Sequence, residues 1–204
     1  MTTFDERARD WDTPDRIARA AEMADVVRAS IPLAPTDRLV DVGAGTGLLG
    51  LALVDDVGEV VLLDPSAGMI DVATAKLAGG SLPTVHAARH DLLADPPPPE
   101  RFDVVVSLLV LHHLKDTRAA LRAIRELLVP GGRIALADLD TEDGTFHSAD
   151  AEGIHHHGFD RAGLEALARE VGFDEVATRT AIVLDEDDGH FGGYPVFLLT
   201  GQRR

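Results

Sequence analysis

The sequence predicts an α/β fold, a single Rossmann-like domain with helices on both faces of a seven-stranded, mostly parallel sheet that ends in an antiparallel C-terminal hairpin. Short apolar runs alternate with amphipathic stretches through residue 138, which is typical of parallel strands joined by helices. A glycine-rich turn follows the first apolar run. Two β-rich segments close the chain and would complete one mixed sheet.

Composition narrows the class of protein. The 204 residues are 45% hydrophobic, which suits one globular domain, and the absence of cysteine excludes disulfides, thiolate metal sites and a cysteine nucleophile. A net charge of −16 repels phosphate backbones and anionic surfaces, so we expect neither nucleic acid nor membrane as a partner. The N-terminus lacks the apolar core of a signal peptide and no apolar run could span a bilayer, so we expect a soluble cytoplasmic protein.

The first half of the chain begins with a helix. Apolar residues recur at helical spacing from Arg16 until prolines end the pattern at Pro32 and Pro35. The elements expected next are a strand at 39–43, a helix near 47–54, a strand at 60–64, a helix near 67–77 and a weaker strand at 84–87. These segments supply the first three parallel strands.

A run of four prolines at 96–99 opens the second half as a stiff extended connection. The elements expected after it are a buried strand at 102–107, a helix capped by Asp116, a turn at 130–132, a strand at 133–138, an irregular stretch at 140–158, a helix from Asp160 to Gly172, and β-rich segments near 175–184 and 195–201. The acidic loop 185–188 with its glycines separates the last two.

The glycine-rich turn from Gly45 to Gly50 matches the dinucleotide fingerprint G-x-G-x-x-G, which is a weak signal alone. A dinucleotide would place its pyrophosphate at the start of the following helix. Asp41 stands just before the turn, where a carboxylate repels a pyrophosphate and attracts an ammonium or sulfonium group. The alternative is that Asp41 only hydrogen-bonds the backbone of the turn.

Two further acids follow successive strands. Asp64 ends the second strand about 20 residues after the turn, a position suited to binding two ribose hydroxyls, although it could also cap the next helix. Asp91 follows the third strand and could accept a hydrogen bond from an adenine amino group, with a solvated loop carboxylate as the alternative.

These motifs, in this order, resemble those of class I S-adenosylmethionine-dependent methyltransferases. The stretches that carry the resemblance are Val40-Asp-Val-Gly-Ala-Gly-Thr-Gly, Leu63-Asp-Pro-Ser-Ala-Gly-Met-Ile, Asp91-Leu, Phe102-Asp-Val-Val-Val-Ser through His112-His-Leu, and Leu128-Val-Pro-Gly-Gly-Arg-Ile. They span about residues 16–138, and the Pro-Gly-Gly turn is typical of members that act on small molecules. The resemblance implies S-adenosyl-L-methionine as cofactor and a small-molecule acceptor, in a monomer or homodimer.

The resemblance also implies which residues bind the cofactor. The implied contacts are Asp41, Gly43, Ala44 and Gly45 for the methionine portion, Asp64 and Pro65 for the ribose, Met69, Asp91 and Leu92 for the adenine, and Ser107 and Leu108 beside the sulfonium. The segment 4–12 is similar to the lid of some members, with Trp11 over the cofactor or, alternatively, anchoring the first helix. The parts of the domain are then a helical lid at 1–30, a cofactor-binding core at 31–138, an acceptor-side insert at 139–159, and a C-terminal helix and hairpin at 160–204.

Methyl transfer needs alignment of donor and acceptor, and a general base only where the acceptor loses a proton. Histidine is the candidate base because its pKa lies near neutrality. His112 and His113 follow the fourth strand, and His156 and His157 lie in the insert, with structural or solvated roles as the alternatives. His147 lies in the same insert as the three consecutive histidines that begin at His155, but no spacing completes a recognised metal site, so we expect no metal.

Two other functions fit parts of the pattern. A nicotinamide-dependent oxidoreductase would use the same glycine turn, but the sequence has no Tyr-x-x-x-Lys and its single tyrosine is Tyr194. A non-catalytic module that binds S-adenosylmethionine would explain the lack of a secure base. The sequence does not identify the acceptor or the atom that is methylated.

Overall fold

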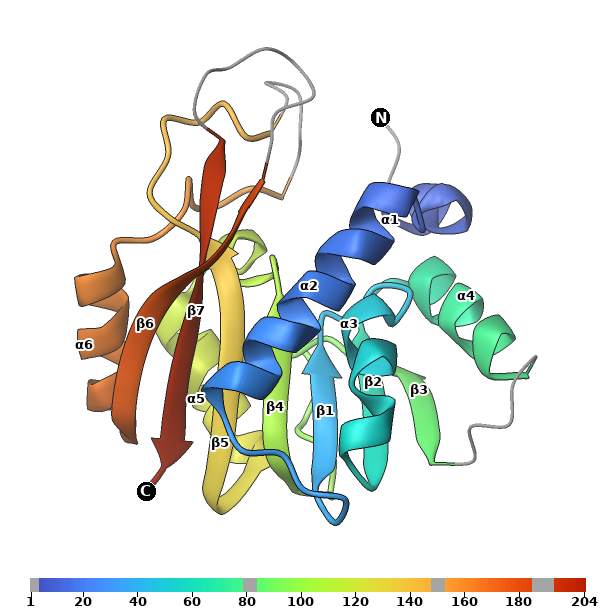
Figure 1. The fold of residues 1–204 in the computed structure, drawn as a ribbon, viewed down its shortest axis with the longest axis horizontal. Helices are drawn as coiled ribbons and strands as arrows, with labels where there is room; N and C mark the ends of the chain where they lie inside the picture. Colours follow the sequence, from blue (N-terminus) through green and yellow to red (C-terminus); the bar gives the residue numbers. More distant parts are fainter. Residues whose placement is uncertain (1–3, 79–83, 148–152, 185–192) are drawn as a thin grey trace.

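The computed structural model describes residues 4–78, 84–147, 153–184 and 193–204. The expected seven-stranded sheet is present, with strand order β3-β2-β1-β4-β5-β7-β6 (Figure 1). Its strands are β1 (Arg38–Val42), β2 (Glu59–Asp64), β3 (Val85–Arg89), β4 (Phe102–Leu108), β5 (Leu128–Leu139), β6 (Phe173–Leu184) and β7 (Tyr194–Arg203). The first five run parallel, and β7 pairs antiparallel with both β5 and β6, which confirms the predicted hairpin.

Helices cover both faces of the sheet. They are α1 (Phe4–Arg7), α2 (Pro14–Ser30), α3 (Leu48–Ala52), α4 (Ala67–Ala78), α5 (Thr117–Leu127) and α6 (Arg161–Val171), with short 3-10 turns η1 (Ala8–Asp10), η2 (Val54–Asp56) and η3 (Leu111–His113). The apolar faces of α2, α3 and α4 join one core cluster, and those of α5 and α6 join another on the opposite face. Figure 1 shows α2 and α3 in front of the strands and α5 behind them.

Local sequence explains where the elements begin and end. Helix α2 starts earlier than its apolar pattern predicts, because the Thr13 side chain accepts a hydrogen bond from the Arg16 amide at 3.3 Å and Pro14 takes the first helical position. Asp116 caps α5 and Asp160 caps α6 as predicted, and α6 ends at Gly172, whose φ of 109° is left-handed. The proline run contains no helix or strand.

Strand β5 differs from its prediction. The Pro-Gly-Gly segment, expected as a turn before the strand, lies within β5, where the pairing with β4 shifts register between Phe102 and Val104. Gly131 has a φ of 80°, a conformation that favours glycine, so the strand irregularity needs this residue type. The glycine pair at 79–80 and the acidic loop at 185–188 lie outside the described residues.

The strand order reverses between β1 and β4, and ligands of open α/β sheets bind beyond the carboxyl ends of the strands at such a point. The glycine turn, the residues after β4 and the end of β5 all meet at this edge. In the described part of the chain, no helix is both long and apolar enough to cross a bilayer.

Candidate functional site

The glycine turn after β1 adopts the backbone that its composition predicts. Gly43, Gly45 and Gly47 have φ angles of 68°, 56° and 87°, in the left-handed region where a side chain is strained. The amides of Gly43 and Ala44 both donate to the Leu63 carbonyl, at 2.8 and 3.0 Å, so the turn is tied to β2. A Cβ added to Gly43 would lie 2.4 Å from the Val110 side chain, so the residues after β4 approach the turn closely.

Asp41 is buried beneath the turn. Its Oδ2 accepts a hydrogen bond from the Gly50 amide at 2.9 Å, so the backbone contact considered from sequence is present. Burial, with the negative charge of Asp64 as a smaller cause, raises the pKa of the Asp41 carboxyl to about 7. A cation nearby would favour the ionised carboxylate, so this environment fits the ammonium end of an amino-acid tail.

Asp64 links the two halves of the predicted donor site. One oxygen accepts from the Gly45 amide at 2.8 Å and the other from the Ser66 amide at 2.8 Å, while the residue is 8% exposed. Burial raises the pKa of this carboxyl above its usual value. An ionised carboxylate has about four acceptor positions, so the pair of amides leaves capacity for two hydroxyl donors, which fits a ribose.

The N-terminal segment lies over this edge of the sheet. Asp5 Oδ1 accepts from the Ser66 hydroxyl at 2.5 Å and from the Gly68 amide at 2.9 Å, at the start of α4. These hydrogen bonds lower the pKa of the Asp5 carboxyl. The indole nitrogen of Trp11 lies 3.5 Å from where a Cβ on Gly45 would stand, so the lid predicted from 4–12 rests against the glycine turn.

A second contact fastens the lid. Asp12 accepts from the Thr46 hydroxyl at 2.5 Å and forms an ion pair with Lys76 at 2.6 Å. Lys76 also donates to the Thr46 carbonyl at 2.8 Å. The Arg16 guanidinium lies 4.1 Å from the centre of the Trp11 ring, which favours a cation–π contact. Both predicted alternatives for Trp11 therefore have support, because it contacts the first long helix as well as the turn.

The other residues predicted to bind the donor differ in their surroundings: some lie near the glycine turn, and others bond to the sheet or to a local loop. Met69 is buried, with its sulfur near Gly45. Ser107 donates to the Val42 carbonyl at 2.8 Å, so its hydroxyl joins β4 to β1. Asp91 Oδ1 accepts from the amides of Leu93 and Ala94, which makes it the cap of a local turn. Leu92 and Leu108 are partly buried against the two cores, and Pro65 is exposed, with its carbonyl bonded to Arg89.

A buried histidine–aspartate pair lies at the same edge, on the side where the acceptor is expected from the sequence. His112 Nδ1 lies 2.7 Å from Asp138 Oδ1, and both side chains are almost completely buried, at 1% and 0% exposure. A carboxylate only accepts, so this contact assigns the Nδ1 proton to His112 and leaves a lone pair on Nε2. Asp138 was not singled out from sequence, although an acid at the carboxyl end of the strand beside β4 was a readable signal.

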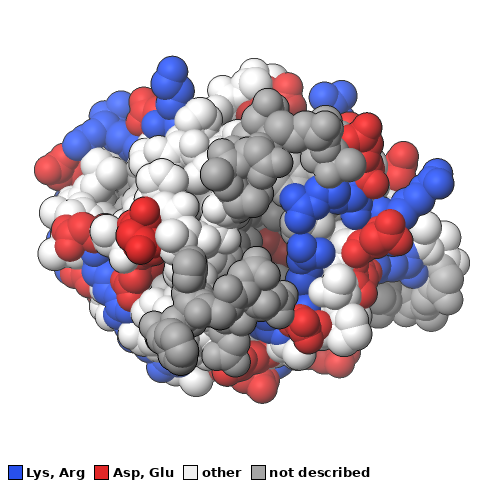
Figure 2. Space-filling model, turned by 90° about the horizontal axis from the view of Figure 1, so that it is seen from above, with Lys and Arg blue, Asp and Glu red and all other residues white. Residues whose placement is uncertain are grey.

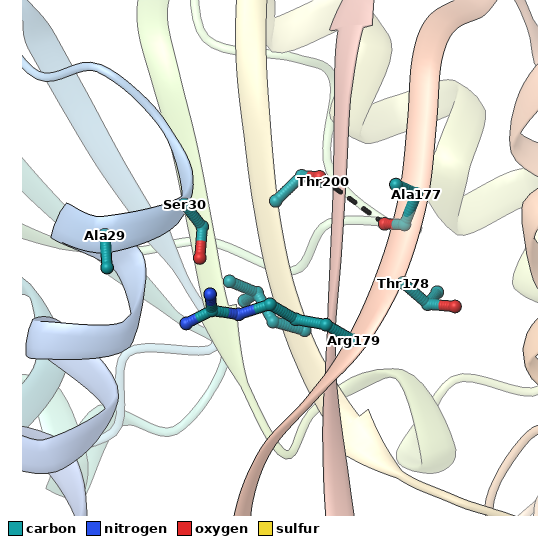
Figure 3. A pocket seen from close by; sticks show the side chains of 7 residues that line it. Ala29, Ser30, Ala177, Thr178, Arg179 and Thr200 are labelled. Carbon is teal, nitrogen blue, oxygen red and sulfur yellow. Dashed lines mark hydrogen bonds between the residues drawn. The ribbon is translucent and has the colours of Figure 1, made fainter.

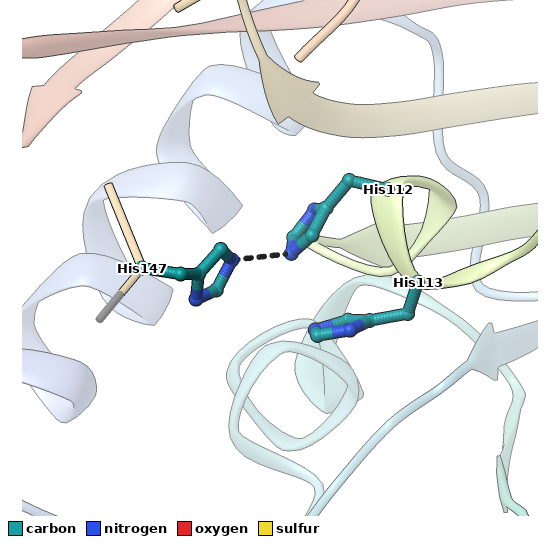
Figure 4. A group of neighbouring side chains, drawn as sticks. All are labelled: His112, His113 and His147. Carbon is teal, nitrogen blue, oxygen red and sulfur yellow. Dashed lines mark hydrogen bonds between the residues drawn. The ribbon is translucent and has the colours of Figure 1, made fainter. Parts of the chain in front are cut away.

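His113 and His147 complete a cluster with His112 (Figure 4). His147 Nε2 lies 3.1 Å from His112 Nε2, and His113 Nδ1 lies 3.0 Å from the Gly153 carbonyl. Burial, followed by the neighbouring His112, lowers the pKa of both His113 and His147 to about 4. Both rings are therefore neutral near pH 7.

The insert brings His147 back to the strands. The Glu142 carboxylate accepts from the amides of Gly144, Thr145 and Phe146 and so curls the segment after β5. The Phe146 ring packs edge-on against His147 and Tyr194, with ring centres 4.7 and 5.0 Å apart. The local turn made by Glu142, together with the long-range contact of Phe146 with Tyr194, holds His147 next to His112.

The other candidate histidines make local contacts. His156 Nε2 lies 3.0 Å from the Leu114 carbonyl and 3.3 Å from the Thr117 hydroxyl, at the start of α5. His157 is 63% exposed and its Nδ1 lies 3.2 Å from Glu142. The amides of His155 and His156 both donate to the His112 carbonyl, so this run supports the loop that carries His112.

Viewed from the carboxyl edge, the molecule has a central hollow with lysine and arginine side chains along its right side (Figure 2). A separate shallow pocket of about 220 Å³ lies between the end of α2 and strands β6 and β7 (Figure 3). Its lining includes Ser30, Arg179 and Thr200, and Thr200 donates to the Ala177 carbonyl at 3.4 Å. It contains neither the glycine turn nor the histidine cluster.

Comparisons with known proteins agree with the geometry of the core. A family model described as a methyltransferase domain matches residues 40–134. An uncharacterized methyltransferase of Mycobacterium tuberculosis is 34% identical over 122 residues, covering 58% of this chain and 60% of the relative. A ubiquinone/menaquinone biosynthesis C-methyltransferase of Vibrio campbellii is 29% identical over 170 residues, covering 69% of this chain and 65% of the relative. The chain thus spans less than two thirds of the length of these relatives.

Solved structures share the whole fold. A putative methyltransferase of Haloferax volcanii, solved in complex with the Trm112 methyltransferase activator, superposes with a TM-score of 0.78 over 99% of this chain and 98% of its own. The two sequences are 22% identical. The likeness of fold therefore extends beyond the matched residues 40–134 to both ends of the chain.

Proposed function

We propose that this protein, whose residues 40–134 match a family model described as a methyltransferase domain, transfers the methyl group of S-adenosylmethionine to a small-molecule acceptor. The observation that carries the proposal is Asp64, whose buried carboxylate holds the glycine turn and the start of α4 and retains acceptor positions for two hydroxyls. Asp41 beneath the same turn suits an ammonium group.

When bound, S-adenosylmethionine supplies a methyl group already activated by its sulfonium. The protein then has to bind the donor, orient the acceptor and exclude water. Asp64 and Asp41 would bind the two polar ends of the donor. The segment 4–12 would cover it, because Asp5, Trp11 and Asp12 all contact the turn or the start of α4.

His112 is the proposed base for an acceptor that loses a proton. Asp138 accepts a hydrogen bond from the Nδ1–H of His112, so the Nε2 lone pair is directed away from the carboxylate, toward His147. An acceptor hydroxyl in place of that contact would donate to Nε2, and the imidazolium formed would be stabilised by Asp138. The contacts of His156 with Leu114 and of His157 with Glu142 favour structural roles for these two.

Two further observations favour a small acceptor. The insert 139–159 returns to the edge of the sheet through Glu142 and Phe146, so the space beside His112 is bordered by the chain itself. The relatives whose printed names include a substrate, such as the ubiquinone/menaquinone biosynthesis enzyme, act on small molecules. An acceptor with an ionisable hydroxyl or an acidic carbon suits His112 as base.

Calorimetry with S-adenosylhomocysteine tests the donor site. We expect one molecule to bind the wild type, and Asp64→Ala to weaken binding about 100-fold, since each lost charge-assisted hydrogen bond contributes about 1.5–3 kcal/mol. Asp71→Ala removes an exposed carboxylate from α4 and should bind like the wild type. No binding to the wild type at millimolar ligand would contradict the proposal.

Methyl transfer needs a second measurement. The protein is incubated with methyl-labelled S-adenosylmethionine and a small-molecule extract, and the labelled products are separated by chromatography. A reproducible labelled product that the Asp64→Ala protein does not form supports methyl transfer. Donor binding without any labelled product would favour the non-catalytic binding module instead.

A further inference from the structure

The three clustered histidines come from two segments that only the fold brings together. His112 and His113 lie in η3 after β4, and His147 lies in the insert after β5. One nitrogen from each ring lies within 4.8 Å of the nitrogens from the other two, and Figure 4 shows the rings grouped around a common space. His112 Nε2 and His147 Nε2 are 3.1 Å apart.

The hydrogen bonds on the far sides of two rings orient their lone pairs. The Nδ1–H of His112 donates a hydrogen bond to Asp138 at 2.7 Å, and the Nδ1–H of His113 donates one to the Gly153 carbonyl at 3.0 Å. Both partners accept only, so Nε2 of each ring lacks a proton when the ring is neutral. A metal-ligating histidine usually has such a carboxylate or carbonyl partner, which fixes its tautomer.

The spacing and donor types restrict the ion. Four-coordinate zinc with zinc–nitrogen distances of about 2.0–2.1 Å places its nitrogen ligands about 3.3 Å apart. The His112–His147 separation is close to this value, and the third ring offers a nitrogen within 4.8 Å of both. Imidazole donors suit zinc, cobalt, nickel and copper, whereas magnesium and calcium prefer oxygen.

We propose that His112, His113 and His147 bind one divalent transition metal ion, with zinc as the expected occupant, leaving a coordination position for a water or an acceptor oxygen. Three protein ligands with an open fourth position are typical of catalytic rather than structural zinc sites. The Phe4 ring stands edge-on to His113, with centres 5.4 Å apart, and the Phe146 ring stands beside His147, so aromatic side chains border the site.

The metal site and the proposed base use the same atom. A metal on His112 Nε2 occupies the lone pair that would take the acceptor proton, so bound zinc should reduce any methyl transfer that depends on His112 as base. Metal binding itself requires neither donor nor acceptor. The two proposals can therefore fail separately: zinc that binds without affecting transfer would contradict the base, not the metal site.

Calorimetric titration of tag-free, metal-free full-length protein with zinc chloride tests the site. We expect one ion per chain, and His147→Ala and His113→Ala should each weaken binding by about tenfold or more. The matched control is the double variant His155→Ala/His157→Ala, which removes two exposed histidines of the consecutive run and should bind like the wild type. Circular dichroism checks that each variant is folded.

Cobalt(II) provides a readout that does not depend on the variants. Binding at the cluster should produce the visible absorption of a four-coordinate cobalt ion, and zinc should displace it with a stoichiometry of one. Asp138→Asn, which alters the partner of His112, should weaken metal binding about tenfold. Equal loss of binding in the His155→Ala/His157→Ala control, or a wild type that binds neither ion at micromolar concentration, would overturn the proposal.

Discussion

The proposed donor and acceptor sides of the carboxyl edge, called the donor side and the acceptor side, are built in different ways. On the donor side, Asp41, Gly45 and Asp64 are held by hydrogen bonds to the backbone of the turns beside them. On the acceptor side, His112 depends on the side chains of Asp138 and His147, which lie on other elements. A site made from backbone turns is constrained by residue types at fixed spacing, whereas a site made from side chains of separate elements can change without altering those turns.

The largest expected effect separates the two sides. His112→Ala should lower kcat about 10²–10⁴-fold, the usual contribution of a general base, while S-adenosylhomocysteine affinity stays unchanged. Steady-state kinetics with methyl-labelled S-adenosylmethionine and the acceptor isolated from the extract gives kcat, and added imidazole should restore part of it. Asp138 is a positioning residue, because it acts through His112. Its replacement, Asp138→Asn, should lower kcat with little change in KM. A parallel loss of donor affinity would break the distinction between the sides.

The glycine turn gives the next effect. Gly43→Ala should lower the free energy of unfolding by about 2–4 kcal/mol, because alanine is strained at a φ of 68° and its Cβ would meet Val110 at 2.4 Å. Gly153→Ala is the control, since its φ is 76° but nothing lies within 4 Å of an added Cβ. Urea unfolding measures the free energy of unfolding of both variants. Equal losses of stability would show that the close approach of Val110 is unimportant.

The pKa of Asp41 predicts a pH dependence of stability. Between its unfolded value of 3.8 and its folded value of about 7, the folded protein keeps a proton that the unfolded chain has lost, so stability falls as pH rises. From pH 5 to 8 the free energy of unfolding of the wild type should fall by about 2–3 kcal/mol more than that of Asp41→Asn. The comparison with this variant cancels the contributions of the other titrating groups. Urea unfolding at the two pH values measures this difference, and parallel curves would contradict it.

The lid should give the smallest effect. Trp11→Ala should speed dissociation of S-adenosylhomocysteine about tenfold, since one aromatic contact contributes about 1 kcal/mol or slightly more. Ile17→Ala, an exposed position on α2, serves as the control. Stopped-flow displacement by a competing ligand gives both rates. If Trp11 only anchors α2, its replacement will lower the melting temperature and leave the dissociation rate unchanged.

Much of the donor side could be predicted from sequence. The turn at 43–47 is predicted by glycines, the residues that favour the left-handed φ angles found there. Asp64 is predicted by its place at the end of a buried strand. The sequence did not distinguish the acids that face the proposed cofactor site from those that bond to their own loop. Asp91 caps a local turn through the amides of Leu93 and Ala94, a contact that depends on how the chain leaves β3.

The acceptor side was only partly predictable. The sequence marked His112 and His113 by their position after a strand, and it grouped His147 with the consecutive histidines 155–157. The fold places His147 against His112 instead, because Glu142 curls the insert and Phe146 packs on Tyr194 from β7. No local pattern encodes a contact between segments 35 residues apart.

The sequence by itself determined the class of fold and the strand-turn-helix at Asp41–Gly47, because apolar periodicity and glycine conformations act over a few residues. The donor was implied by the resemblance of the ordered motifs to a known family. The tertiary structure alone decided that Asp138 contacts His112, that His147 joins the cluster and that the N-terminal segment contacts Gly45 and Ser66. These contacts join side chains from elements brought together by the packing of both cores, so their chemistry exists only once the sheet has formed.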